Sequence, residues 1–127
     1  MLEVVGSVFQ KKLKLLMHRY IKHTYSVTKS FPKEELYSSV SQIRRASLSV
    51  ALNYIEGYAR RRKKVQLNFY EMSYGSLKES KYLFYFALDQ KWISKDEYAE
   101  AIKLADEIGA MLWSEIESAQ KSIDKGF

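Results

Sequence analysis

The chain has 127 residues, of which 46% are hydrophobic and 28% charged, and its net charge is +6. This length and balance predict one globular domain over residues 1–127 and exclude a disordered chain. The absence of cysteine excludes disulfides, thiolate metal sites and cysteine nucleophiles, and it fits a reducing cytoplasm. Residues 1–10 lack the features of a signal peptide, and the longest aromatic–aliphatic stretch, residues 82–88, is too short to span a bilayer. We therefore expect a cytoplasmic protein.

Positive charge is concentrated in the first half of the chain. Residues 1–64 hold 14 Lys and Arg against 4 acids, a net charge of +10, whereas residues 94–127 hold 4 against 8, a net charge of −4. This polarity favours either an anionic partner at the basic end or head-to-tail contact between copies of the chain.

The N-terminal segment is predicted to form one long helix. Its apolar stripe has steps of three and four residues: Val5, Phe9, Leu13, Leu16, Tyr20, Thr24 and Val27. The opposite side is nearly all positive and holds Lys11, Lys14, His18, Lys22 and Lys29. A boundary follows at Pro32, because the residue before a proline resists α geometry.

A second helix is predicted to start at Pro32, with Glu34 and Glu35 at the positive end of its dipole. Its main seam is Leu36, Val40, Ile43, Ser47, Val50, Tyr54 and Gly57. A second apolar row lies beside the seam and holds Tyr37, Leu48, Leu52, Ile55 and Ala59. Such a wide apolar arc fits either a central helix covered by two neighbours or a helix that meets another subunit.

Five consecutive cations, Arg60, Arg61, Arg62, Lys63 and Lys64, are termed here the basic run. They repel one another, so we place the second connection there and expect a third helix from about Val65 to Leu88. Its predicted core row is Phe69, Met72, Ser76, Leu83 and Ala87, with Ser73, Gly75 and Ser80 allowing close helix approach.

A fourth helix is predicted from Lys95, because Ser94 and Glu97 have the spacing of a capping box. Its apolar row has helical spacing nearly to the end of the chain and holds Tyr98, Ile102, Ala105, Ile108, Leu112, Ile116, Ala119 and Ile123. Gly126 can close the last turn. Four helices with short connections predict an all-α fold, an antiparallel up-down-up-down four-helix bundle.

Features of a catalytic or metal site are scarce in the sequence. His18 and His23 are five residues apart, which turns them away from each other, and we expect both on a solvated helix face. There is no glycine-rich phosphate loop, and close helix packing is the expected role of Gly57, Gly75 and Gly109. We expect no catalytic residues, no metal, no cofactor and no enzymatic activity.

The basic run is the strongest functional feature, because phosphates would neutralise its five cations. A solubilising turn is the plainer interpretation. A row of alternating aromatic and basic residues follows on the third helix and holds Tyr74, Lys78, Lys81 and Tyr85. This row suits base stacking or an oligomer interface, where tyrosine is enriched.

Four ordered motifs resemble a known family. They are residues 30–35 (SFPKEE), 41–46 (SQIRRA), 53–58 (NYIEGY) and 75–79 (GSLKE). The sequence is similar to the four-helix-bundle family encoded in intervening sequences of bacterial large-subunit ribosomal RNA genes. Related proteins include the accessory variability determinants of diversity-generating retroelements. The resemblance to these implies a homopentameric barrel that binds nucleic acid through a basic surface and associates with a reverse transcriptase.

In this chain Arg44 and Arg45 match the family's paired arginines, and Asn53, Glu56 and Gly57 match its Asn-x-x-Glu-Gly element. The basic run is more basic than is usual in the family, and residues 50–52 are larger and more apolar than its pattern. These departures leave the subfamily, and hence the biological role, open. The choice between RNA and DNA is open as well.

We therefore expect a non-enzymatic homo-oligomer, a pentamer by resemblance, that binds RNA or DNA with little sequence preference. The alternative is a protein-interaction scaffold that docks an acidic partner or a reverse transcriptase. The expected nucleic-acid residues are Lys11, Lys14, Lys22, Arg44, Arg45, Arg60, Arg61, Arg62, Lys63 and Lys64. The expected oligomer interface is Tyr37, Leu48, Leu52, Ile55, Tyr74 and Tyr85.

Overall fold

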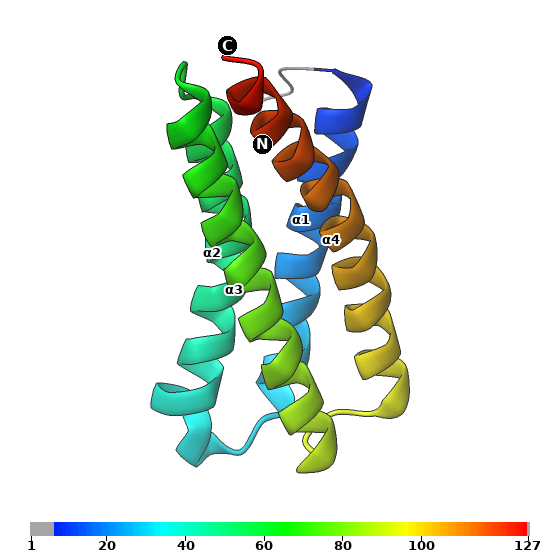
Figure 1. The fold of residues 1–127 in the computed structure, drawn as a ribbon. Helices are drawn as coiled ribbons and strands as arrows, with labels where there is room; N and C mark the ends of the chain where they lie inside the picture. Colours follow the sequence, from blue (N-terminus) through cyan, green and yellow to red (C-terminus); the bar gives the residue numbers. More distant parts are fainter. Residues whose placement is uncertain (1–6, 127) are drawn as a thin grey trace.

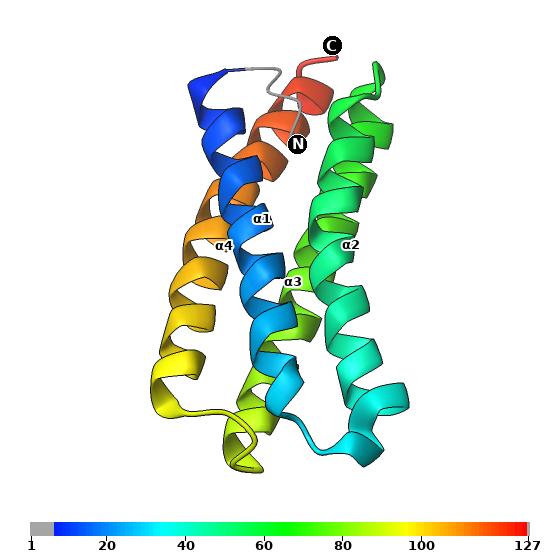
Figure 2. The same cartoon turned by 180° about the vertical axis from the view of Figure 1, so that it is seen from behind.

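The computed structural model describes residues 7–126, which form a bundle of four long helices with no strand in that part of the chain. The helices are α1 (Val8–Val27), α2 (Ser41–Tyr58), α3 (Lys63–Asp89) and α4 (Lys95–Asp124). Successive helices run in opposite directions (Figures 1 and 2). The predicted antiparallel four-helix bundle is confirmed. One end of the bundle holds the α2–α3 connection, the start of α1 and the end of α4, and is termed here the basic end.

Capping boxes fix the starts of α1 and α4. Ser94 Oγ accepts from the Glu97 amide at 3.0 Å and the Glu97 carboxylate accepts from the Ser94 amide at 2.8 Å, as the sequence predicted. Ser7 and Gln10 form the same pair of contacts at α1. Gly126 has a φ of 79° and its amide donates to Ile123 O, which closes the end of α4 in the predicted way.

The predicted core rows of α1, α2 and α4 are largely confirmed. Buried members of these rows are Leu13, Leu16, Tyr20, Thr24, Val27, Val40, Ile43, Ser47, Val50, Tyr54, Gly57, Ala105, Ile108, Leu112, Ile116 and Ala119. Phe9 and Leu36, at the outer ends of two rows, are exposed, and Val5 lies outside the described residues.

The predicted core row of α3 is wrong by about one position. Met72 is exposed and Phe69, Ser76 and Leu83 are only partly buried, while Ala87 is buried as expected. The buried row is Tyr70, Ser73, Leu77, Ser80, Phe84 and Ala87. The two buried serines of this row are stable in the core because their hydroxyls form hydrogen bonds. Ser73 donates to Val50 O, and Ser80 bonds with both Leu77 O and Tyr20 Oη.

The two connections that flank α2 differ from the prediction. After Pro32 the chain forms a 3₁₀ turn (Lys33–Glu35) and a π turn (Leu36–Val40), so regular α geometry begins only at Ser41. The Glu35 carboxylate accepts hydrogen bonds from Ser39 and Ser38, which lower its pKa. At the other end of α2, the connection is residues 59–62, and Lys63 and Lys64 belong to the first turn of α3 rather than to the connection.

The glycines serve different purposes. A Cβ on Gly57 would lie 2.8 Å from Tyr70 Cε1, so close packing explains this glycine as predicted. A Cβ on Gly75 would meet no atom within 4 Å, so the packing role predicted for Gly75 is wrong. At Gly109 a Cβ would be in ordinary contact with Leu77 Cδ2 at 3.5 Å.

Candidate nucleic-acid interface

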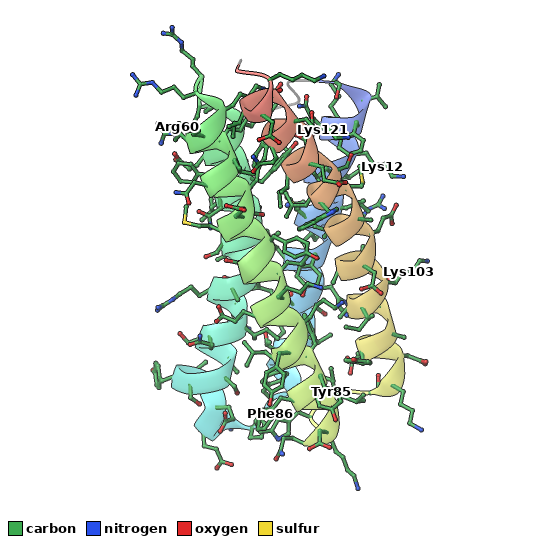
Figure 3. All side chains as sticks on the ribbon, viewed as in Figure 1. Lys12, Arg60, Tyr85, Phe86, Lys103 and Lys121 are labelled. Carbon is green, nitrogen blue, oxygen red and sulfur yellow. The ribbon has the colours of Figure 1, made fainter. Side chains whose placement is uncertain are left out.

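The basic run lies exposed at the basic end of the bundle. Arg60, Arg61 and Arg62 are in the α2–α3 connection, and Figure 3 shows Arg60 at this end, where long nitrogen-tipped side chains extend away from the helices. Arg60 donates to Glu56 at 2.6 Å and its guanidinium lies 5.2 Å from the centre of the Phe69 ring. Among residues 7–126, the other four members of the run have no ion-pair partner.

The backbone adds to the positive potential at this point. The helix dipole places partial positive charge at the start of α3, and an acid or a capping oxygen there would compensate it. Within the described part of the chain, α3 has no side-chain cap and no acid in its first turn, which instead begins with Lys63 and Lys64. The start of α3 and the run, of which Arg60 is paired with Glu56, together form an anion-attracting surface.

An open hollow of about 790 Å³ lies against the run. It is lined by Ala59, Arg60, Arg61, Arg62, Val65 and Phe69. Three arginines therefore line one hollow, which suits the phosphates of a nucleotide chain, while the Arg60 guanidinium already lies over the Phe69 ring.

The predicted nucleic-acid residues do not form one patch. Arg44 and Arg45 are near the start of α2, about 20 Å along the helix axis from its end beside the run. Arg44 is also engaged inside the chain: Nε donates to Thr28 Oγ1 at 2.9 Å and the guanidinium lies over the Tyr25 ring. Arg45 is exposed.

The lysines of α1 are divided in the same way. Lys11 and Lys14 are in the half of α1 that begins at the basic end, while Lys22 is near the opposite end. Lys14 is half-buried, with its Nζ 5.3 Å from the centre of the Tyr58 ring, so it faces α2 rather than solvent. Lys12 pairs with Glu107 of α4 at 3.2 Å.

The second apolar row of α2 is not covered by the chain's own helices. Tyr37, Leu52 and Ile55 are 91%, 58% and 44% exposed, and Leu48 is half-buried. The sequence left open whether two neighbouring helices of the same chain cover this row. The structure excludes that interpretation for these three exposed residues. Leu48 and Leu52 line two adjoining hollows, one of about 530 Å³ that reaches Tyr37 and Arg45 and one of about 150 Å³ that reaches His18 and Ile55.

The tyrosine and lysine row of α3 is less free than predicted. Tyr74 is half-buried with its ring 5.4 Å from that of Trp113, and Lys78 lies over the Tyr74 ring. Lys81 pairs with Asp106 of α4 at 2.8 Å. Tyr85, at the far end beside Tyr82, is exposed, and so is Lys78. Much of this row therefore closes the α3–α4 seam and is not an open stacking platform.

The two histidines differ from each other. His18 is exposed as expected, but the expectation of a solvated His23 is wrong. His23 is half-buried, its Nε2 lies 2.8 Å from Glu97 O, and its ring stacks on Phe84. No group of three or more His, Cys, Asp or Glu side chains among residues 7–126 is arranged to hold a metal ion.

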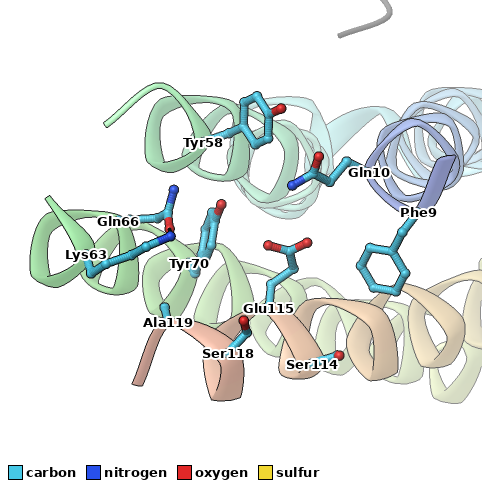
Figure 4. Close-up of a pocket in the computed structure, with 10 residues that line it drawn as sticks. All are labelled: Phe9, Gln10, Tyr58, Lys63, Gln66, Tyr70, Ser114, Glu115, Ser118 and Ala119. Carbon is cyan, nitrogen blue, oxygen red and sulfur yellow. Dashed lines mark hydrogen bonds between the residues drawn. The ribbon is translucent and has the colours of Figure 1, made fainter. Parts of the chain in front are cut away.

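A polar pocket of about 400 Å³ at the basic end was not predicted. Figure 4 shows its lining residues, which come from all four helices: Phe9, Gln10, Tyr58, Lys63, Gln66, Tyr70, Ser114, Glu115, Ser118 and Ala119. One feature of the sequence is consistent with this pocket. Glu115 takes a place in the apolar seam of α4, with Leu112 three residues before it and Ala119 four residues after it.

Glu115 is the central charged group of this pocket. Burial raises the pKa of its carboxyl, and this effect outweighs the nearby Tyr54 hydroxyl, Lys63 ammonium and Gln10 amide, which lower it. Burial and the Glu115 charge also raise the pKa of both Tyr54 and Tyr70. The Tyr54 hydroxyl is fully buried with no hydrogen-bond partner among the described residues. Glu115, Tyr54, Tyr70, Gln10 and Lys63 therefore form one interacting polar cluster.

No helix of the described residues has both the length and the apolar character needed to cross a bilayer. No curated protein matches the chain.

Among solved structures, the chain is similar to a protein of unknown function from the S23 ribosomal protein family of Bacteroides thetaiotaomicron. The two are 17% identical with a TM-score of 0.75, over 82% of this chain and 97% of that one, which is a likeness of fold.

The model of one protein family, described as 23S rRNA-intervening sequence protein, matches residues 11–114. These residues include most of the bundle and the whole basic run. Neither this match nor the solved neighbour supports the relation to diversity-generating retroelements that the sequence motifs suggested. The chain belongs to the 23S rRNA-intervening sequence protein family.

Proposed function

We propose that this protein is a non-enzymatic homo-oligomer that binds nucleic acid, RNA in the first place, through the phosphate backbone at the basic run. The observation that carries the proposal is the juxtaposition of five exposed cations with the uncapped start of α3. Four of these cations have no ion pair in residues 7–126, so phosphates would relieve their mutual repulsion. The family's ribosomal RNA context favours RNA over DNA.

Self-association is the second part of the proposal. The apolar flank consists of Leu48, Leu52 and Ile55, over about two turns of α2, and of Tyr37 in the preceding π turn. A hollow that Arg44 and Arg45 also line lies between Tyr37 and Leu48, and a second hollow adjoins Ile55. Several copies of the basic run on one assembly would bind a single strand together, so a weak individual site gains affinity through effective concentration.

Binding across a salt series tests the proposal. Single-stranded RNA, single-stranded DNA and duplex DNA are titrated with wild-type protein and with a variant in which all five residues of the run are glutamine. The wild-type affinity should fall by roughly 0.7–0.9 log units per phosphate contact for each decade of salt, and the variant should bind more weakly with a flatter slope.

A matched control removes five exposed lysines elsewhere, Lys29, Lys33, Lys91, Lys95 and Lys103, which changes the net charge equally. This control should keep most of the wild-type affinity. Equal losses in both variants would show a general charge effect and reject the run as the site. Loss of assembly in the run variant would instead favour a scaffold in which the run contacts the acidic α4 of another copy, around Glu100 and Asp106.

A further inference from the structure

We propose that the polar pocket beside the basic run binds a guanine base, with the Glu115 carboxylate as the partner of its Watson–Crick edge. The inference rests on the proposed function in one respect: the base is supplied by an RNA strand whose phosphates contact the run. Lys63 belongs both to the run and to the lining of the pocket, so the two sites are continuous.

Glu115 is placed for a ligand rather than for stability. Glu115 lies half-buried among aromatic rings and forms no ion pair with any of residues 7–126. The cation that attracts its carboxylate is Lys63, which lies too far away for an ion pair. Lys63 itself donates to Gln66 Oε1 at 3.2 Å. The Tyr54 and Tyr70 hydroxyls and the Gln10 amide also act on this carboxylate. Its two oxygens accept at about four positions, so acceptor capacity directed into the pocket remains, as Figure 4 shows.

The donor opposite Glu115 is held in place by the α1 cap. Gln10 Oε1 accepts from the Ser7 amide at 3.0 Å, which fixes the orientation of the Gln10 side chain and leaves its NH₂ group to face the pocket. The pocket thus presents an amide donor close to a pair of carboxylate acceptors.

Guanine matches this pattern and the other RNA bases do not. Its Watson–Crick edge carries two adjacent donors, N1–H and the 2-amino group, beside the acceptor O6, so a carboxylate can accept from both donors while an amide donates to O6. Adenine and cytosine would turn a ring-nitrogen acceptor toward the carboxylate, and uracil offers one donor flanked by two acceptors. These arrangements leave like lone pairs in contact and are repulsive.

Aromatic rings supply the stacking surface. Tyr58 and Tyr70 lie on one side of the Glu115 carboxylate and Phe9 on the other, and the volume of about 400 Å³ is within the usual range of about 300–1,000 Å³ for small-molecule pockets. Unstacked bases of single-stranded RNA are commonly held in this way, between aromatic faces and with their edges hydrogen-bonded.

The test uses labelled single-stranded RNAs made of uridine with one central guanine, inosine or adenine, titrated with the full chain and followed by fluorescence anisotropy. The guanine strand should bind about tenfold more tightly than the adenine strand, with inosine between them because it lacks only the 2-amino donor. Glu115→Gln should abolish the difference, because an amide has one acceptor and one donor. Glu117→Gln, at an exposed position of the same helix, should retain it.

The outcomes separate this inference from the proposed function. Equal affinity for the three strands with a steep salt dependence overturns the guanine pocket and leaves phosphate binding at the run standing, as does a guanine preference that survives Glu115→Gln. Titration with GMP and AMP distinguishes the source of the base. Glu115-dependent binding of GMP without binding of any RNA keeps the pocket but assigns it to a free nucleotide and overturns the proposed function. Binding of neither RNA nor GMP overturns both.

Discussion

The Cβ position of Gly57 lies 2.8 Å from Cε1 of the buried Tyr70 ring, so α2 and α3 are in contact where no larger residue fits. The same ring lines the polar pocket. The glycine of the Asn-x-x-Glu-Gly element therefore sets the position of one wall of the candidate guanine site, and its role is packing rather than backbone freedom.

Gly57→Ala should destabilise the protein, by about 1–2 kcal/mol, because overpacking outweighs the better helix propensity of alanine. Gly75→Ala is the matched control in α3, where an added Cβ meets no atom within 4 Å, and it should stabilise by up to about 1 kcal/mol. Urea unfolding followed by circular dichroism measures both changes. Equal effects of the two substitutions would contradict the close contact at Gly57.

The hydroxyls of Tyr20 and Ser80 form a buried hydrogen bond of 2.6 Å across α1 and α3. Ser80 donates to Leu77 O at 2.8 Å, so Tyr20 is the donor of the pair. Ser80→Ala should cost about 1–3 kcal/mol because it leaves the Tyr20 hydroxyl buried without a partner. The double substitution Tyr20→Phe with Ser80→Ala should be more stable than the sum of the two single changes implies. A double-mutant cycle with additive energies would show that the bond contributes nothing.

Glu115 should lower the stability of the folded chain near neutral pH. Its pKa is raised by burial above its ordinary value of 4.5, so the folded state binds the proton more tightly than the unfolded state. Stability must then fall as the pH rises through the interval from 4.5 to the folded-state pKa, and the loss persists above that interval.

Glu115→Gln is therefore expected to raise the free energy of unfolding at pH 7 by on the order of 0.5 kcal/mol, a value that allows for solvent screening of a half-exposed group. The gain should vanish below about pH 4. Glu117→Gln at an exposed position should change little at either pH. Denaturant unfolding at the two pH values makes the comparison, and a loss of stability in Glu115→Gln at pH 7 would show that the carboxylate supports the fold.

Leu52→Glu should dissociate the proposed oligomer without unfolding the chain, since Leu52 is 58% exposed and a charge there remains solvated in the monomer. Met72→Glu, at a 41% exposed position of α3 outside the apolar flank, should leave the assembly unchanged. Light scattering gives the mass and circular dichroism the helical content. A monomeric wild-type protein at micromolar concentration would remove the basis of this prediction.

The sequence predicted α1, α2 and α4 well because large apolar residues occupy their seams, such as Leu13 and Leu16 in α1 and Ile108 and Leu112 in α4. It failed for most of the α3 core row, although the close helix approach expected at Ser73 and Ser80 is confirmed, since both are buried with hydrogen bonds to other helices. No period along one segment can show such partners.

The candidate site divides in the same manner. The basic run could be read directly because its five cations are consecutive, although Lys63 and Lys64 turned out to be helical. The polar pocket could not, because Gln10, Tyr58 and Glu115 come from three helices and meet only after folding. The acid in the apolar seam of α4 was the one local sign of it.

Replacement of Lys63 and Lys64 by glutamine should stabilise the protein at low salt, because the two ammonium groups repel each other and lie at the positive end of the α3 dipole. The total gain should stay below about 1 kcal/mol, because loss of the attraction between Lys63 and the Glu115 carboxylate offsets part of it, and added salt should shrink it by screening. Sulfate and phosphate are expected to bind the uncapped start of α3 in the wild-type chain. At equal ionic strength, replacing chloride by either anion should raise the melting temperature of the wild type more than that of the variant. Lys29 and Lys33 replaced in the same way give the control, since they are exposed at the opposite end of the bundle. If sulfate raises the melting temperatures of the wild type and of both variants equally, the start of α3 is no anion site, and the nucleic-acid interface would have to be sought elsewhere on the positive surface.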